Sequence, residues 1–208
     1  MDQSIFHKLP SKIIPVLVLE DSSKALEVGS AFVESGMPII EITLRTKSAW
    51  DSIEKLKGLS GLTLGVGSVT SSAQLRKAVE LGVQFMVSPG FDEKLVEEAL
   101  LHNVAYLPGI SNPSDLIKAE RFGLSTVKFF PADILGGVKA LKAMSAPFPG
   151  FSFIPTGGIS DKNLNEYLKE KNIPAVGGSW MISKDAIASG DFNTLRRDIS
   201  SALQSVTN

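Results

Sequence analysis

The amino-acid sequence predicts an α/β protein, a single-domain (β/α)8 TIM barrel. Short apolar segments typical of buried strands alternate with amphipathic helical segments along the chain. We count eight such strands at intervals of about 20 to 26 residues, and strands that alternate with helices are expected to run parallel. An open doubly wound sheet usually has fewer strands and begins with a glycine-rich dinucleotide motif, so the closed barrel matches better.

Each predicted element is bounded by turn or capping residues. The strands are predicted at residues 13–19, 38–44, 62–67, 84–88, 103–107, 126–130, 152–156 and 175–178. The intervening helices are predicted at residues 24–35, 48–57, 72–81, 93–102, 114–122, 136–144 and 163–171. Several of these helices end at a glycine such as Gly36 or Gly82, the residue preferred just past a helix C-terminus. Residues 1–12 are expected to form a short helical segment that closes one end of the core.

The composition argues against a nucleic-acid-binding, disulfide-bonded, secreted or membrane protein. The 208 residues are 43% hydrophobic and carry a net charge of −1, with both signs interspersed, whereas nucleic-acid-binding proteins usually have a basic patch. There is no cysteine for disulfides or thiolate chemistry. No apolar run reaches the roughly 18 residues of a membrane span, and the N-terminus lacks a secretory signal pattern. We expect one cytoplasmic domain, residues 1–208, with no nucleic-acid or membrane partner.

Lys128 breaks the apolar pattern of the sixth predicted strand. A strand covered by helices is close to uniformly apolar, and a buried ammonium costs several kcal/mol unless it is paired or loses its proton. A neutral lysine in a dry pocket is a nucleophile that captures carbonyl substrates as Schiff bases. The alternative is a lysine near a strand end whose amine reaches solvent.

The second strand carries further polar residues. Alternation along it places Glu41, Thr43 and Arg45 toward the barrel axis, on the same side as Lys128. A carboxylate and a guanidinium would be costly in a core unless they line a cavity, although a structural Glu41–Arg45 salt bridge is an alternative. Desolvation beside Phe130, with Arg45 nearby, is expected to lower the pKa of Lys128, while Glu41 opposes this shift.

Glycines gather where the last two strands end. In a (β/α)8 barrel the loops after strands 7 and 8 commonly bind phosphate, because the backbone approaches closely and its amides favour an anion. We therefore expect Gly157, Gly158, Gly178 and Ser179 to bind phosphate. The chain has two histidines, His7 and His102, which are far apart in sequence, so we expect no metal and no cofactor.

Five segments resemble the motifs of the bacterial 2-keto-3-deoxy-6-phosphogluconate (KDPG) and 4-hydroxy-2-oxoglutarate (KHG) aldolases, in order and with similar spacing. They are residues 41–46 (EITLRT), 65–69 (GVGSV), 127–132 (VKFFPA), 155–159 (PTGGI) and 177–180 (GGSW). The similarity runs from about residue 5 to residue 200. It implies a metal-independent class I aldolase that cleaves a phosphorylated keto acid to pyruvate and glyceraldehyde 3-phosphate, and a homotrimer.

The resemblance also implies roles for individual residues. Lys128 would form the Schiff base and Glu41 would accept and donate protons. Ligands of the pyruvate part would be Arg45, Ser68, Thr156, Phe130 and Pro89. The family usually has threonine where this chain has Ser68, so a methyl group that packs against pyruvate is lost and affinity at that end is expected to change.

Two other functions fit the same residues. A phosphate-binding barrel isomerase or epimerase would use Lys128 to polarise a carbonyl without forming a covalent bond. A non-catalytic sugar-phosphate-binding barrel would need no buried proton shuttle. Within the aldolase hypothesis, KDPG, its galactonate epimer and KHG all remain possible substrates.

Overall fold

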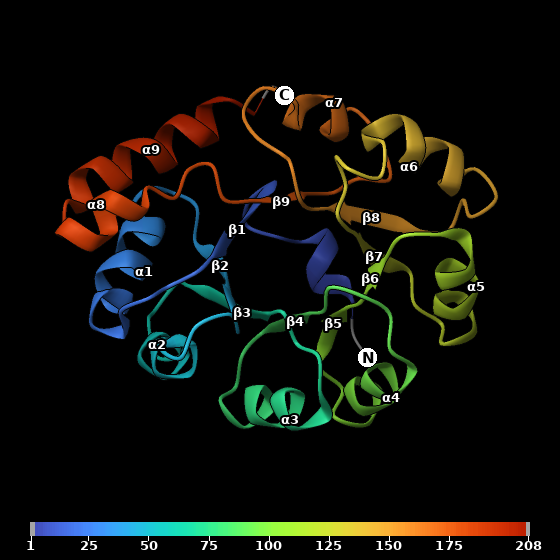
Figure 1. The fold of residues 1–208 in the computed structure, drawn as a ribbon, viewed down its shortest axis with the longest axis horizontal. Coiled ribbons are helices and arrows are strands. Elements are labelled where there is room, and N and C mark those ends of the chain that lie inside the picture. Colours follow the sequence, from blue (N-terminus) through green and yellow to red (C-terminus); the bar gives the residue numbers. More distant parts are fainter. Residues whose placement is uncertain (1–2, 207–208) are drawn as a thin grey trace.

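The computed structural model describes residues 3–206, which form a central group of strands with helices on the outside (Figure 1). The strands are β1 Ile13–Leu17, β2 Ile39–Thr43, β3 Thr63–Gly67, β4 Phe85–Val87, β5 Ala105–Leu107, β6 Gly109–Ile110, β7 Thr126–Phe129, β8 Ser152–Pro155 and β9 Val176–Gly178. The helices are η1 Ser4–His7, η2 Ser22–Lys24, α1 Ala25–Glu34, α2 Ala49–Leu56, α3 Ser72–Glu80, α4 Glu93–Leu101, α5 Pro113–Arg121, α6 Gly137–Ser145, α7 Leu164–Leu168, α8 Lys184–Ser189 and α9 Phe192–Gln204.

All paired strands are parallel, as the strand–helix alternation predicted. Six strands form one curled sheet in the order β5-β4-β3-β2-β1-β9, and three form a second sheet in the order β6-β7-β8. A single parallel bridge between Thr156 and Gly177 joins the end of β8 to β9. The sequence therefore predicted the α/β class and the parallel strand direction correctly. It predicted one closed sheet of eight strands, whereas the strands form two sheets, of six and three strands.

The chain changes from one sheet to the other at Pro108, directly after the fifth predicted strand, residues 103–107. β5 pairs with β4, but β6, which begins one residue after the proline, pairs with β7. The carbonyl of Pro108 accepts a hydrogen bond from the Lys128 amide at 2.9 Å, so the chain changes partner at this residue. Gly109 makes the change possible because a side chain there would collide with the backbone of Pro89.

Polar side chains begin several helices where the sequence offers capping residues. The Asp92 carboxylate accepts the amide of Leu95 at 3.0 Å before α4, and the Asn112 side chain accepts the amide of Asp115 at 3.1 Å at the start of α5. Such side chains satisfy backbone amides that have no partner within the helix. Six of the seven predicted helical segments thus appear with ends that differ by at most one residue.

Two parts of the helical prediction were incomplete. The helix predicted at residues 163–171 ends at Leu168, because the following backbone turns toward β8 and the Asn172 carbonyl accepts the amide of Phe153 at 2.8 Å. The sequence pattern did not delimit α8 and α9, which follow β9. Helix α9 packs against α1, and Arg196 on α9 donates to Glu34 on α1 at 2.8 Å.

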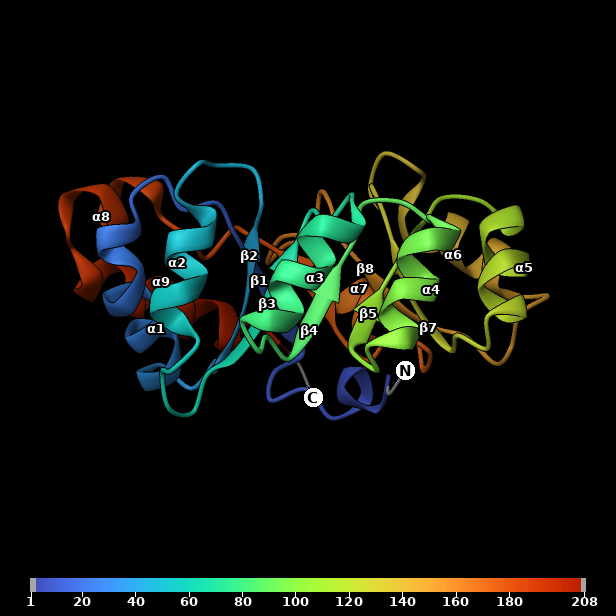
Figure 2. The same ribbon diagram turned by 90° about the horizontal axis from the view of Figure 1, so that it is seen from below.

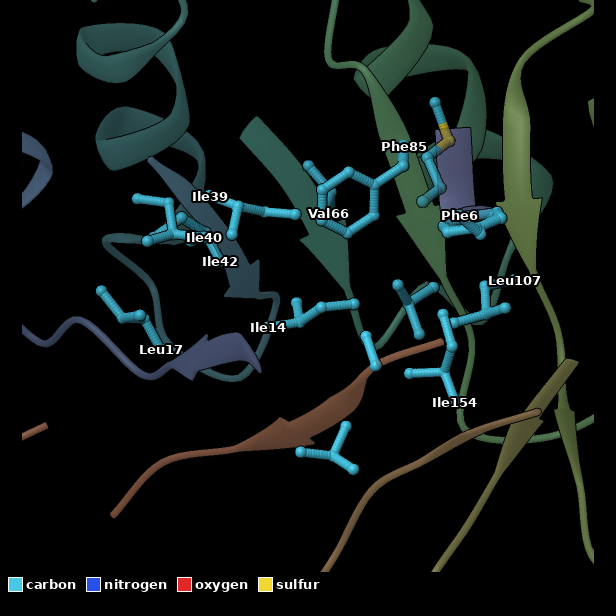
Figure 3. Close-up of a cluster of buried hydrophobic side chains, with 14 of the residues drawn as sticks. Phe6, Ile14, Leu17, Ile39, Ile40, Ile42, Val66, Phe85, Leu107 and Ile154 are labelled. Carbon is cyan, nitrogen blue, oxygen red and sulfur yellow. The ribbon is translucent and has the colours of Figure 1, made fainter. Parts of the chain in front are cut away.

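The core lies between the strands and between strands and helices. Side chains from different strands, including Ile14 of β1 and Ile154 of β8, point into the same apolar interior (Figure 3). The ring of Phe85 lies over Gly65, where any side chain would collide with it. Strands buried on both faces are expected to be apolar throughout, so each polar side chain among them requires an explanation.

The N-terminal segment lies beneath the strands (Figure 2). Phe6 of η1 is fully buried and its ring meets that of Phe85 edge-on at 6.1 Å. The Gln3 side chain donates to the carbonyls of Tyr106 and Thr126 at 2.9 and 2.8 Å, and it accepts the amides of Ser125 and Thr126 at 2.9 and 3.0 Å. One amide side chain therefore links β5 to β7, where the two named sheets meet.

Within residues 3–206, no helix has the length and hydrophobicity needed to cross a membrane.

Replacing Gln3 by alanine should lower the free energy of unfolding by about 2–4 kcal/mol, because four backbone groups lose a buried partner. Urea titration followed by circular dichroism measures the change. The exposed Gln204, at the end of α9, provides the matched control, and Gln204→Ala should stay within about 0.5 kcal/mol of the unmodified chain. Equal effects of the two substitutions would show that the Gln3 hydrogen bonds contribute nothing.

Candidate active site

Lys128 lies in the middle of β7, and its side chain is only 4% exposed. Its backbone is held on both sides, since Lys128 is paired with Gly109 of β6 and with Ile154 of β8. The backbone at Lys128 is therefore held by pairing on both edges, and no shift of this strand would carry the amine to solvent. The alternative of a lysine that extends freely into water does not fit this burial.

Burial has the largest effect on the pKa of Lys128. Desolvation lowers the pKa of its ammonium below the ordinary lysine value, Glu41 acts in the opposite direction by favouring the charge, and Arg45 adds to the lowering. The amine lies 4.8 Å from the centre of the Phe130 ring. The direction of the shift agrees with the sequence-based expectation, and it increases the share of neutral, nucleophilic amine at any given pH.

Glu41 lies within β2 and is 3% exposed. Its carboxylate occupies the space above Gly67 of β3, where even a methyl group would collide with it. No ion pair within 4.0 Å joins Glu41 to Lys128 or to Arg45 among the described residues. Glu41 therefore acts on the lysine through space, and the structural Glu41–Arg45 salt bridge considered above is not formed.

Arg45 lies outside the strand from which its direction was predicted. Alternation along the second strand placed it toward the barrel axis, but β2 ends at Thr43, so Arg45 lies in the following turn and is exposed. Its Nε donates to the Ser68 hydroxyl at 3.2 Å. Arg45 and Ser68 thus form a pair at the ends of neighbouring strands, although neither was expected to bind the other.

Ser68 has a φ angle of 61°, in the left-handed region. A side chain other than glycine adopts this conformation at a cost on the order of 1–3 kcal/mol, and it persists only where the surrounding structure holds it. The strain therefore indicates that the placement of the Ser68 hydroxyl is imposed by its neighbours. Strained residues of this kind are frequent at ligand-binding sites.

A cavity of about 140 Å³ opens at the ends of the strands. Seven of the residues that the sequence singled out line it together, namely Arg45, Phe130, Thr156, Gly157, Gly158, Gly178 and Ser179. Val16 and Ile159 also line it. These two were missed because an apolar residue, whether in a strand such as β1 or in the loop after β8, gives no signal that separates it from the core.

The loop after β8 turns at two glycines with left-handed backbone. Gly157 and Gly158 have φ angles of 97° and 79°, which side chains rarely adopt. The loop after β7 holds this backbone in place, since the amides of Ala132 and Asp133 donate to the carbonyls of Thr156 and Gly157 at 2.8 and 3.0 Å.

Next to it, Gly178 lies under the ring of Trp180, and Ser179 is exposed at the cavity. Asp133 is packed against Gly158, so an acidic side chain borders the proposed phosphate loop, a feature that the sequence analysis did not anticipate.

Four of the predicted site residues do not line this cavity. Glu41 and Lys128 are more deeply buried, Ser68 contacts the cavity residue Arg45 through a hydrogen bond, and Pro89 is exposed at the end of β4. Pro89 touches Gly109, the residue paired with Lys128, so it borders the lysine through the backbone. No group of three or more potential metal ligands occurs among residues 3–206.

The structure combines a buried amine with a lowered pKa on β7, a buried carboxylate on β2 and a guanidinium–hydroxyl pair in the turns after β2 and β3. The amine can add to a carbonyl, the carboxylate can move protons, and arginine can hold a carboxylate bidentately. A small keto acid with a second anionic group fits these groups and the glycine-rich loops.

Comparison with known proteins gives the same family that the sequence motifs resembled. Residues 5–197 match the family model of the KDPG and KHG aldolases. The chain is 39% identical over 194 residues to the 2-dehydro-3-deoxy-phosphogluconate aldolase of Pseudoalteromonas atlantica, covering 93% of this chain and 89% of that one. It is also 39% identical to the KHG/KDPG aldolase of Escherichia coli, over 89% of this chain and 87% of that protein.

The fold is close to that of a solved relative. The KDPG aldolase of Legionella pneumophila, whose crystal structure holds pyruvate as a covalent carbinolamine, superposes with a TM-score of 0.92 at 32% identity, over 98% of each chain. The match to the family model, the identity to its members and this likeness over nearly the whole length agree. The chain belongs to the KDPG and KHG aldolase family.

Proposed function

We propose that this protein is a class I aldolase that reversibly cleaves 2-dehydro-3-deoxy-6-phosphogluconate to pyruvate and glyceraldehyde 3-phosphate, and that it also cleaves 4-hydroxy-2-oxoglutarate to pyruvate and glyoxylate. The observation that carries the proposal is the buried Lys128, whose pKa is lowered by desolvation beside a buried carboxylate. The covalent pyruvate carbinolamine in the Legionella relative supports the same chemistry for this chain.

The reaction begins when the neutral amine of Lys128 adds to the keto carbon and forms a carbinolamine. Loss of water gives an imine, whose positive nitrogen accepts electrons when the carbon–carbon bond breaks. Glu41 takes the proton of the substrate hydroxyl as the aldehyde leaves, and the resulting enamine is then protonated at carbon. Water hydrolyses the imine, releases pyruvate and restores the free amine. The imine supplies the electron sink, so the proposed cycle needs no metal or cofactor.

The substrate is proposed to lie across the strand ends. Arg45 and Ser68 bind the carboxylate of the pyruvate part, and Thr156, Phe130 and Pro89 contact its remaining surface. Phosphate binds at Gly157, Gly158, Gly178 and Ser179. The common lining of one cavity by Arg45 and the glycine loops supports this orientation, because it brings the proposed carboxylate and phosphate ligands to the same opening.

We also propose that the chain is one domain whose two parallel sheets complete a closed (β/α)8 barrel. The Thr156–Gly177 bridge between β8 and β9 supports closure on one side. On the other side, β5 and β6 are separated only by Pro108, and they pair with β4 and β7 respectively. A homotrimer follows from the family resemblance, and exposed apolar side chains such as Leu101 and Ile134 offer surface for it. The absence of cysteine favours a cytoplasmic protein.

Pyruvate and borohydride should add a stable mass to Lys128, located by peptide mass spectrometry, and Lys128→Ala should abolish both labelling and turnover. Reduction traps an imine, whereas a lysine that merely polarises a carbonyl leaves no adduct. A Lys139→Ala variant, which removes an exposed lysine of α6, should label as the unmodified chain does. Failure of the folded protein to label would exclude the Schiff-base mechanism and favour the isomerase alternative.

Competitive labelling with trace acetic anhydride should show that Lys128 titrates below the ordinary lysine pKa of 10.5. Glu41→Gln should lower the midpoint further, because the carboxylate that favours the ammonium is removed. Arg45→Gln should raise the midpoint, because a repelling positive charge is removed. A midpoint that rose in Glu41→Gln would contradict the electrostatic assignment.

Ser179→Glu should raise KM for the phosphorylated keto acid at least about tenfold, because a carboxylate at the cavity repels phosphate. KM for unphosphorylated 4-hydroxy-2-oxoglutarate should change much less. Steady-state assays of pyruvate release compare the two, and Ser60→Glu, at an exposed turn before β3, controls for added charge. If both substrates were affected equally, the phosphate assignment would be wrong.

A further inference from the structure

Two hydroxyl groups form a buried chain behind the candidate site. Tyr106 of β5 is fully buried, and its hydroxyl donates to Ser88 Oγ at 2.6 Å. Ser88, 1% exposed, donates in turn to the carbonyl of Val69 at 2.5 Å. A carbonyl can only accept, so the single proton of the Ser88 hydroxyl is committed to Val69. The tyrosine must therefore be the donor to Ser88, so the hydrogen bonds run in one direction, from Tyr106 through Ser88 to Val69.

The last acceptor in this series of hydrogen bonds is the carbonyl of Val69, the residue after Ser68. Both backbone polar groups of Val69 are held from the β4 side, because its amide also donates to the carbonyl of Val87 at 3.1 Å. On the other side of Ser68, the carbonyl of Gly67 accepts the amide of Leu44 at 2.9 Å. Ser68 thus lies between two fixed peptide groups.

The fixed peptides explain how Ser68 keeps its left-handed φ of 61°. A serine released from these constraints would return to a negative φ, which the side chain prefers. That change would turn its hydroxyl away from Arg45, whose Nε it accepts at 3.2 Å. Arg45 is otherwise exposed, so this hydrogen bond is what orients its guanidinium near the strand ends.

The tyrosine is itself anchored from the opposite end of the fold. Its backbone carbonyl accepts from Gln3 Nε2 at 2.9 Å, in the segment beneath the strands. Burial raises the pKa of the Tyr106 hydroxyl, so it stays a proton donor throughout the neutral range. Tyr106 is therefore a fixed donor rather than an adaptable core side chain.

We propose that Tyr106 and Ser88 are positioning residues for the carboxylate subsite made by Ser68 and Arg45. The inference rests on the proposed function, because it assumes that this pair binds the carboxylate of the keto acid. Among the described residues, neither hydroxyl has a hydrogen bond to Lys128, and neither residue lines the cavity. They set the affinity for the carboxylate and leave the steps at the lysine unchanged.

The test compares Tyr106→Phe and Ser88→Ala with the unmodified chain. The pyruvate concentration that half-saturates borohydride trapping at Lys128 should rise about 3- to 10-fold in each variant, the effect of one hydrogen bond. The kcat for aldol cleavage should stay within about twofold, because the interaction is the same in the ground and transition states. Thermal unfolding establishes a temperature at which every variant is folded.

A double-mutant cycle separates positioning from a general effect on the core. In a Ser68→Ala background the hydroxyl to be positioned is gone, so adding Tyr106→Phe should raise the half-saturating pyruvate concentration no further. Tyr167→Phe, at the other tyrosine of the chain, removes the same group from α7 and should leave trapping unchanged.

Any of three results would overturn the proposal. The half-saturating pyruvate concentration could be unchanged in Tyr106→Phe, or it could rise equally in Tyr167→Phe. It could also rise in the Tyr106→Phe/Ser68→Ala double variant by the product of the two single-variant factors. Each would be obtained alongside normal trapping in the unmodified chain, so the aldolase function would stand. Absence of the Lys128 adduct in the unmodified chain would instead overturn both proposals.

Discussion

The burial of one amine among parallel strands is the constraint on which the site depends. Lys128 lacks a carboxylate within ion-pair distance among the described residues, and desolvation outweighs the attraction of Glu41, so its pKa falls. The unfolded chain then binds more protons than the folded one between the two pKa values. The lysine destabilises the fold at pH values below its folded pKa, and this penalty disappears as the pH rises toward the ordinary lysine value.

Glycine provides the space in which the buried polar groups sit. The Glu41 carboxylate fills the position of a side chain at Gly67, the backbone of Pro89 does so at Gly109, and the Thr156 hydroxyl does so at Gly177. All three glycines lie in strands adjoining a site residue. A methyl group at any of them would displace the group that the proposed chemistry needs, so these residues are required for close approach rather than for turning the chain.

Much of the fold and site follows from periodicity and from residues out of place in it. Alternating strands and helices predicted the parallel order, and a lysine and a glutamate in apolar strands indicated a buried reactive pair. The partner change at Pro108 could not be predicted, because a proline after a strand reads equally well as its end. The turn that carries Arg45 was not foreseen, because strand alternation was extended past Thr43, where β2 stops, although Arg45 still lines the cavity with Phe130 and Thr156. The Tyr106–Ser88 chain joins residues 18 apart in sequence, and no local pattern indicates such a contact.

The first strand completes its pairing only with the last. Ile13 of β1 is paired with Val176 of β9, and the neighbouring helix α1 packs against α9. During synthesis on the ribosome, β1 can pair with β2 early, but its other edge stays open until β9 has emerged. An open, apolar strand edge can pair with another molecule. Chains that lack β9 would therefore expose this edge of β1 and would aggregate more readily than chains that contain it.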